Sequence, residues 1–179
     1  LSPATFTQVN SQQTESLYQL VAEFASLSGQ EVVWDLYSGA GIIALYLAKQ
    51  ASAVIGEENY SPAAANACQN AKLNGIENCR FIAGAAESVL PQLVADGFLA
   101  DLVVLDPPRS GCDRVVLETL LSFMPQRIIY VSCDPATLAR DLRILCDSVY
   151  TVQRVQPVDM FPQTGHVESV VLLMRIDQC

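Results

Sequence analysis

Apolar and polar residues follow one another along this chain in a regular succession, in which a short apolar run leads into a segment with helical periodicity. Near-continuous apolar runs predict buried strands at Glu31–Leu36, Ala53–Gly56, Cys79–Ala83, Leu99–Leu105 and Arg127–Val131. Helices are expected at Ile42–Lys49, from about Ser61, where Ser61-Pro62 supplies a cap and a first-turn proline, and around Pro135–Cys146. Strands that are apolar along their whole length, alternating with helices, indicate a parallel sheet covered on both faces.

The end of the chain departs from this succession. Tyr150–Val158 and Glu168–Ile176 both have the pattern of strands, and no helical pattern separates them. Two such strands in sequence are expected to pair as an antiparallel hairpin. The predicted fold is therefore α/β, with a doubly wound, mostly parallel seven-stranded sheet that ends in an antiparallel hairpin.

Length and composition indicate one globular domain. The chain has 179 residues, of which 51% are hydrophobic, and no apolar run approaches the ~18 residues of a membrane span, so no membrane partner is expected. The N-terminal residues have neither the basic head nor the apolar core of a signal peptide. Because the chain starts at Leu1 without an initiator Met, we expect residues 1–179 to be one domain of a longer protein.

The cysteines and the charge narrow the class further. The six cysteines form no Cys-x-x-Cys pair, which argues against a metal site in this segment. Three disulfides would also use six cysteines, but reduced thiols in the cytoplasm are the better interpretation without a secretory signal. A formal net charge of −9 argues against indiscriminate nucleic-acid binding, which needs a basic surface. If RNA is the substrate, bulk affinity is expected to come from elsewhere.

A glycine-rich turn follows the first predicted strand, with the sequence Asp35-Leu36-Tyr37-Ser38-Gly39-Ala40-Gly41. Gly39 and Gly41 allow a sharp turn and a close approach to a ligand, and Glu58 ends the second strand, where its carboxylate can accept hydrogen bonds from a ribose diol. The spacing to Ala44 also fits a dinucleotide fingerprint. S-adenosylmethionine, which Asp35 favours, NAD, and a purely structural turn all stay open on this motif alone.

Three later segments carry more specific chemistry. The fourth strand ends in Asp106-Pro107-Pro108-Arg109-Ser110-Gly111, where the prolines fix a rigid exit that holds the Asp106 carboxylate at the sheet edge. Cys133 ends the fifth strand just before a helix N-terminus, whose partial positive charge favours the thiolate. Glu168 begins the last strand. The cysteines that lack this position, and that we interpret as buried structural residues, are Cys68, Cys79, Cys112 and Cys146.

Together these segments resemble the RNA uracil-5-methyltransferase family, which modifies transfer and ribosomal RNA. The resemblance runs in order from residue 6 to about 176, and its last two motifs are long and specific. The matching segments are Phe6-x-Gln8-Val9-Asn10, Asp35-Leu36-Tyr37-x-Gly39-x-Gly41, Asp106-Pro107-Pro108-Arg109-x-Gly111, Val131-Ser132-Cys133-x-Pro135-x-Thr137-Leu138-Ala139-Arg140-Asp141, and Asp159-Met160-Phe161-Pro162-x-Thr164-x-His166-x-Glu168.

The resemblance implies a Rossmann-like fold of the class I methyltransferase type and a role for each matching residue. Cys133 would be the nucleophile, Glu168 the base that removes the proton from carbon 5 of uracil, and Arg109 and Phe6 substrate contacts. Among the departures from the family pattern, Glu57 stands where an apolar residue is usual, and Asp134 where Asn is usual. The residues expected to bind S-adenosylmethionine or to shape its pocket are Gln8, Tyr37, Gly39, Gly41, Glu58 and Asp106.

Three other functions fit the sequence less well. An NAD-dependent oxidoreductase would leave the Cys133 segment and the last loop unexplained. A methyltransferase acting on exocyclic nitrogen can share the Asp-Pro-Pro motif but needs no nucleophilic thiol. A non-catalytic RNA-binding or scaffold module fits neither the net charge of −9 nor the intact set of reacting groups. In the resembling family an N-terminal RNA-binding domain supplies much of the choice of RNA, and such a domain is expected outside this segment.

Overall fold

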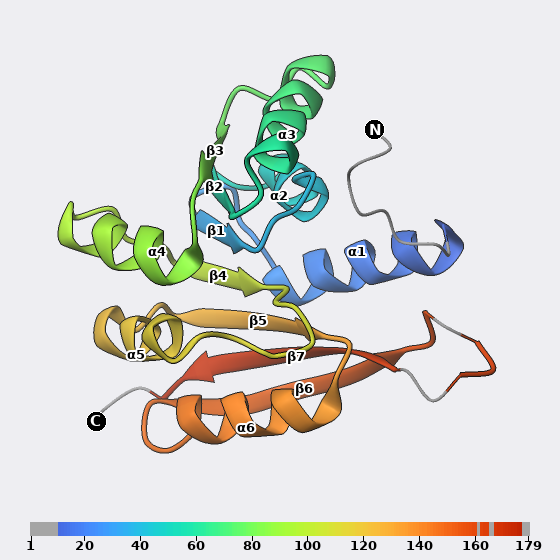
Figure 1. Ribbon diagram of the computed structural model, residues 1–179, viewed down its shortest axis with the longest axis vertical. Coiled ribbons are helices and arrows are strands. Elements are labelled where there is room, and N and C mark those ends of the chain that lie inside the picture. Colours follow the sequence, from blue (N-terminus) through green and yellow to red (C-terminus); the bar gives the residue numbers. More distant parts are fainter. Residues whose placement is uncertain (1–10, 161, 165–166, 177–179) are drawn as a thin grey trace.

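A single sheet of seven strands forms the centre of the molecule in the computed structural model, which describes residues 11–160, 162–164 and 167–176. The strand order is β3-β2-β1-β4-β5-β7-β6 (Figure 1). Strands β1 to β5 are parallel, and β7 runs antiparallel to both of its neighbours. The predicted fold class is confirmed. The strands are β1 Val32–Leu36, β2 Ala53–Glu58, β3 Cys79–Ala83, β4 Leu102–Leu105, β5 Arg127–Ser132, β6 Tyr150–Val158 and β7 Glu168–Arg175.

Helices cover both faces of the sheet, with α1 to α3 on one side and α4 to α6 on the other (Figure 1). In the described part of the chain, no helix is long and apolar enough to cross a membrane. The helices are α1 Ser11–Ala25, α2 Ile42–Ala48, α3 Ser61–Leu73, α4 Ala86–Ala95, α5 Arg114–Phe123 and α6 Pro135–Leu145.

The observed elements differ from the predicted ones mainly in the helices. Strands β3 and β6 have the predicted bounds, whereas β4 begins three residues later than expected, because Leu99 is exposed and the Asp101 carboxylate instead accepts a hydrogen bond from Val32 N at 2.8 Å. Helices α1, α4 and α5 were not predicted. Helix α4 contains Pro91, which is a helix-breaking signal in a sequence.

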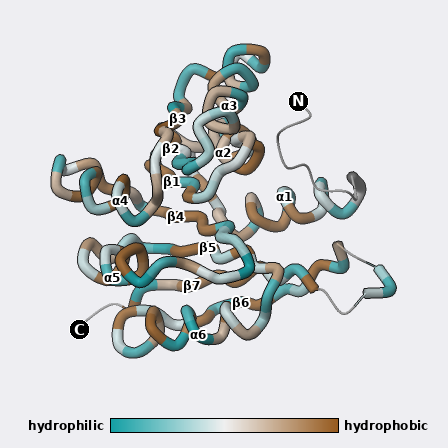
Figure 2. The backbone as a smooth tube through the Cα atoms, in the orientation of Figure 1, coloured by the Kyte–Doolittle hydropathy of each residue, from teal (hydrophilic) through white to brown (hydrophobic). Residues whose placement is uncertain are grey.

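The core has two layers because successive residues of each strand point to opposite faces of the sheet. Trp34 and Leu36 of β1 pack with α4, α5 and α6. Val33 of β1 and Val104 of β4 pack on the other side with α1 and α2. Figure 2 shows hydrophobic colour along the inner strands β4 and β5. The carboxyl ends of the parallel strands therefore lie along one edge of the sheet, between the two layers of helices.

Strand β6 is the exposed margin of the sheet. Its residues from 151 to 157 are all exposed, and its register with β7 shifts between Val152 and Arg154. The Arg154 guanidinium lies 4.5 Å from the centre of the Phe24 ring and 2.7 Å from a carboxylate oxygen of Glu23. These contacts tie the margin to α1.

We expect Leu102→Ala to lower the free energy of unfolding by about 2–5 kcal/mol, because this side chain of the central strand β4 is fully buried. Leu73→Ala is the matched control: Leu73 is 76% exposed, and its loss should change stability by less than about 0.5 kcal/mol. Urea unfolding followed by circular dichroism measures both. Equal effects of the two substitutions would contradict the assignment of β4 to the core.

Candidate active site

The glycine turn after β1 is held by backbone hydrogen bonds to the end of β2. Ser38 N donates to Glu57 O at 2.8 Å, and Gly41 N donates to Ser38 O at 2.8 Å. Gly39 and Gly41 both have positive φ, at 54° and 77°, a backbone region that glycine adopts without a steric penalty. The turn therefore leads directly into α2, as the spacing of the glycines predicted.

An aromatic ring gives Gly41 and Gly56 a second reason to lack side chains. A Cβ atom at Gly41 would lie 2.5 Å from Phe81 Cζ, and one at Gly56 would lie 2.3 Å from Phe81 Cδ1. Phe81 of β3 thus packs across both backbones. No neighbour lies within 4 Å of a Cβ built on Gly39, so Gly39 is required by its backbone conformation and not by crowding.

Two acidic residues fix this turn. Glu58 accepts hydrogen bonds from Gly39 N at 2.8 Å and from Tyr60 N at 2.7 Å, one on each carboxylate oxygen. Asp35 is fully buried, and its Oδ2 accepts from Ala44 N at 2.9 Å, whereas its Oδ1 has no hydrogen-bond partner. A carboxylate oxygen can accept two hydrogen bonds, so both residues keep acceptor capacity for a ligand at the ends of β1 and β2.

Cys133 and Glu168 lie opposite each other on neighbouring strands. Ser132 of β5 pairs with Ser169 of β7 in an antiparallel register, so the next residue of β5 and the preceding residue of β7 face one another. Glu168 is 3% exposed, and its burial raises its pKa. Asp106 follows β4, the neighbour of β5, and burial together with Glu168 raises its pKa to about 7. The predicted nucleophile, the predicted base and the predicted cofactor-binding residue Asp106 thus lie at one edge.

The Cys133 thiol differs from expectation in its ionisation. Its pKa is raised by partial burial and by the Glu168 carboxylate, although Arg109, which hydrogen-bonds the thiol, acts in the opposite direction. The helix N-terminus that was expected to favour the thiolate is occupied: Asp134 Oδ1 accepts from Ala136 N at 2.9 Å and Thr137 N at 3.0 Å. The net direction is therefore upward, and the groups that favour the thiolate are the Cys133 backbone N–H and Arg109.

Tyr37 points away from the glycine turn. Its hydroxyl makes hydrogen bonds with the Cys112 side chain and the Asp113 backbone, and burial is the main cause of its raised pKa. It contributes to a hollow of about 520 Å³ between α4, α5, α6 and the segment after β4. Through these two hydrogen bonds Tyr37 holds the segment that follows β4. Its predicted role as a cofactor contact stays a prediction.

Two residues of the site have no counterpart in the sequence predictions. Tyr18 of α1 is half-buried, and burial followed by the Asp106 and Asp35 carboxylates raises its pKa to about 12. Glu57 is fully buried, with Oε2 accepting from Tyr37 N at 3.2 Å and Oε1 without a partner. Burial raises the pKa of Glu57 to about 7. An acidic residue inside an otherwise apolar strand was the sequence feature that could have pointed to Glu57. Nothing in the sequence near Tyr18 indicates that it lies at the site.

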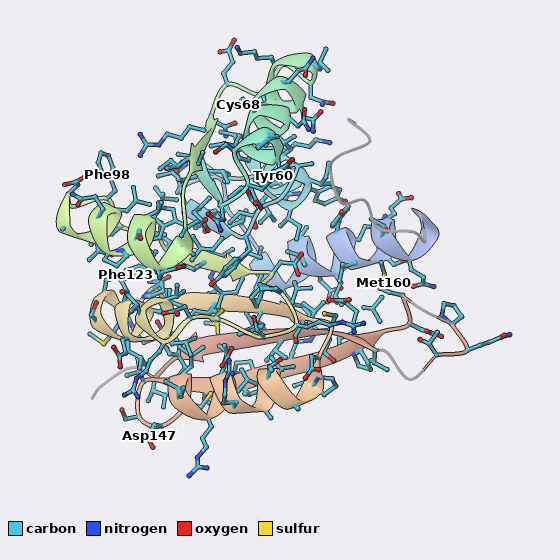
Figure 3. All side chains as sticks on the ribbon, in the orientation of Figure 1. Tyr60, Cys68, Phe98, Phe123, Asp147 and Met160 are labelled. Carbon is cyan, nitrogen blue, oxygen red and sulfur yellow. The ribbon has the colours of Figure 1, made fainter. Side chains whose placement is uncertain are left out.

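Phe6 and Gln8, predicted as a substrate contact and a cofactor contact, lie outside the described residues. Among the residues that are described, no group of three or more His, Cys, Asp or Glu side chains could hold a metal ion. The five described cysteines are free thiols. Cys68 is exposed on α3 (Figure 3), so its interpretation as a buried structural residue is wrong: helix α3 packs through its alanines and leaves Cys68 on the outer face.

Comparison with known sequences gives consistent matches. A family model described as tRNA (Uracil-5-)-methyltransferase matches residues 2–176. The chain is 50% identical over 178 residues to an uncharacterized RNA methyltransferase of Clostridium acetobutylicum, covering 99% of this chain and 39% of that protein. It is 52% identical over 173 residues to an uncharacterized RNA methyltransferase of Halalkalibacterium halodurans, covering 97% and 38%. The chain thus spans about two fifths of the length of these curated relatives.

Comparison with solved structures agrees. The tRNA (uracil-54, C5)-methyltransferase of Pyrococcus abyssi, in complex with S-adenosyl-L-homocysteine, superposes with a TM-score of 0.85 at 33% identity, over 97% of this chain and 41% of that one. An rRNA methylase of Streptococcus thermophilus has a TM-score of 0.70 at 17% identity, over 92% and 97%. The second likeness is one of fold alone.

We expect Glu57→Gln to raise the free energy of unfolding at pH 8 by about 3 kcal/mol, since burial raises the pKa of Glu57 from 4.5 to about 7 and each pH unit corresponds to ~1.4 kcal/mol. A carboxyl with a raised pKa in the folded state binds a proton that the unfolded chain has lost, so its stabilising contribution disappears as pH rises from about 4.5 to about 7. Urea unfolding at pH 5 and pH 8 measures the change. The exposed Glu77→Gln is the control, and an effect of Glu57→Gln that is the same at both pH values would exclude this role for burial.

Proposed function

The chain belongs to the tRNA (uracil-5-)-methyltransferase family, whose model it matches over residues 2–176, and from this premise we propose that it transfers a methyl group from S-adenosylmethionine to carbon 5 of a uridine in transfer or ribosomal RNA. The observation that carries the proposal is the opposition of Cys133 and Glu168 across the β5–β7 pair, with Asp106 on the neighbouring strand. That edge offers a nucleophile and a base on facing positions, which is what methylation of a ring carbon requires.

The residues at the ends of β1 and β2 fit the cofactor. Glu58 has lone pairs left for a ribose diol, and the buried Asp35 Oδ1 lacks a hydrogen-bond partner. Burial raises the pKa of Asp35 and of Asp106, and a ligand that carries an ammonium and a sulfonium group would favour the ionised form of both carboxyls. When bound, S-adenosylmethionine supplies the methyl group as an electrophile. Its demethylated product is present in the solved Pyrococcus abyssi relative, which supports the choice.

Cys133 opens the reaction. Carbon 5 of uracil is a poor nucleophile, because little electron density resides there. Addition of the Cys133 thiolate to carbon 6 forms a C–S bond and moves the ring electrons toward carbon 5 and the carbonyl oxygen. Carbon 5 then becomes the nucleophile that would take the methyl group, as the bond between methyl and sulfonium sulfur breaks and S-adenosylhomocysteine leaves. Arg109, which hydrogen-bonds the thiol, favours the thiolate form that adds to the ring.

Glu168 closes it. After methylation, carbon 5 carries both the new methyl group and its original proton. The Glu168 carboxylate takes that proton, the ring double bond re-forms, and the C–S bond breaks, which returns Cys133 as a thiolate. The target uridine must be unstacked to reach Cys133 and Glu168 at this edge of the sheet.

Other functions fit this edge less well. NAD brings a pyrophosphate, whose negative charge would lie near the carboxylates of Asp35 and Glu58. A methyltransferase for exocyclic nitrogen would leave the facing Cys133 and Glu168 without a role. We also propose that residues 1–179 form the catalytic domain of a longer protein, since the matched relatives are about two and a half times as long. The free thiols support a reducing compartment such as the cytoplasm.

We expect Cys133→Ala to lower methyl transfer to RNA by at least about 10⁴-fold, because covalent catalysis is lost entirely with the nucleophile. The dissociation constant for S-adenosylhomocysteine should stay within about twofold, since the thiol follows β5, which β4 separates from the cofactor residues of β1 and β2. Tritiated methyl transfer and calorimetry measure the two quantities. Cys68→Ala, at an exposed thiol of α3, is the control, and activity of the Cys133 variant at the control's level would refute the mechanism.

For Glu168→Gln we expect a covalent protein–RNA adduct to accumulate. Addition and methylation can proceed without the base, but removal of the carbon 5 proton slows by about 10²–10⁴-fold, which delays release of Cys133. Denaturing electrophoresis with labelled RNA detects the adduct, and Cys133→Ala in the same background should abolish it. Normal turnover without any adduct would show that another group takes the proton.

A further inference from the structure

Asp141 of α6 is a fully buried carboxylate with an unusually complete set of donors. Its Oδ2 accepts from Cys112 N at 2.8 Å and from the Tyr130 hydroxyl at 2.6 Å. Its Oδ1 accepts from Arg140 Nε at 2.8 Å and lies 2.7 Å from Arg140 Nη2. One side chain thus joins helix α6, strand β5 and the segment that follows β4.

Arg140 extends this junction along the segment after β4. Its Nη2 donates to Ser110 O at 2.9 Å while its other contacts hold Asp141. Gly111 lies directly against the pair: a Cβ there would be 2.5 Å from Arg140 Nη2 and 2.6 Å from Asp141 Oδ2. The segment from Ser110 to Cys112 therefore packs closely on α6, which bonds to it at Ser110 O and at Cys112 N.

The same segment carries Arg109, next in sequence to the bonded residues. The Thr137 hydroxyl, one turn before Asp141 on α6, donates to Arg109 O at 3.1 Å. The Arg109 side chain hydrogen-bonds the Cys133 thiol, which precedes the same helix. Side chains of α6 thus hold the backbone at Arg109 and at the residues that follow it, while the Arg109 guanidinium reaches Cys133, two residues before that helix.

We propose that Asp141 is a positioning residue: together with Arg140 and Thr137 it holds the segment Arg109–Cys112 on α6, so that the Arg109 guanidinium stays beside the Cys133 sulfur. The role it would serve rests on the proposed function, in which Cys133 is the nucleophile. The contacts with the segment after β4 reach the reaction through Arg109, and Asp141 itself is shielded from any substrate by complete burial.

A purely structural role would not require this arrangement. Burying a carboxylate is costly unless all its hydrogen bonds are made, and an apolar side chain on α6 could fill the same space more cheaply. A carboxylate is useful here because it accepts from a loop amide, a strand hydroxyl and a guanidinium at the same time. These directional hydrogen bonds hold the loop in one position, whereas apolar contacts would allow it a wider range of positions.

The test is the alkylation rate of Cys133 by iodoacetamide as a function of pH, followed by mass spectrometry of the Cys133 peptide. Without Arg109 at its side the thiol loses a group that favours ionisation, so Asp141→Asn should slow alkylation at pH 7.5 by about threefold to tenfold, with equal rates once the thiol is fully ionised. Thr137→Val, a milder change, should act in the same direction by about twofold. Arg143→Gln, an exposed position of the same helix, is the control and should leave the rate unchanged.

A double-mutant cycle separates positioning from general loosening. If Asp141 acts through Arg109, then Asp141→Asn added to Arg109→Ala should slow alkylation by no more than about 1.5-fold beyond Arg109→Ala alone. A full additional slowing, or an unchanged rate in Asp141→Asn with a native circular dichroism spectrum, would overturn the proposal. If Asp141→Asn unfolds, the cycle with Thr137→Val decides in its place. These rates need neither RNA nor cofactor, so their outcome is independent of whether Cys133→Ala abolishes methyl transfer.

Discussion

Strand β7 lies between β5 and β6 and runs against both, and the geometry of the reacting groups depends on that one pairing. In an antiparallel pair, a strand that starts and a strand that ends meet at the same edge, so Glu168 at the beginning of β7 faces Cys133 just beyond β5. A slip of one residue would turn Glu168 to the other face of the sheet. Val170, Val171 and Leu173 of β7 are fully buried, and their burial keeps the register in place.

Carboxyl groups gather at the ends of the inner strands, where burial removes the water that would solvate their charge. The raised pKa values of Asp35, Glu57, Asp106 and Glu168 all have this first cause. Protonation relieves the repulsion in the free protein, and a cationic ligand would relieve it in the bound one. These carboxyl groups are thus matched to a positively charged ligand, and Glu58 beside them is held by hydrogen bonds from Gly39 N and Tyr60 N.

Chain pattern alone was sufficient for the strands, because long apolar runs bounded by Gly, Pro and Asp are unambiguous. It failed for α4, where Pro91 lies inside the helix, and for α5, whose cap Asp113 was not recognised as one. At the site, motif residues identified Glu58, Asp106, Cys133 and Glu168 as candidates. The ionisation of Cys133, however, depends on its burial and on Glu168 and Arg109, which come close to it only in the folded sheet. Partners distant in sequence, such as Tyr18 beside Asp106, carry no local signal.

The open margin of the sheet has a consequence for assembly. An unpaired strand is a template for another strand, and uncontrolled addition leads to aggregation. In β6, the register shift between Val152 and Arg154 interrupts the regular row of donors and acceptors, and Pro157 has no N–H to donate. The Arg154 side chain also contacts Glu23 and Phe24 of α1. The β6 edge therefore disfavours pairing with a strand of another chain. The sheet stays at seven strands, and the candidate site lies away from this edge, at the carboxyl ends of the parallel strands.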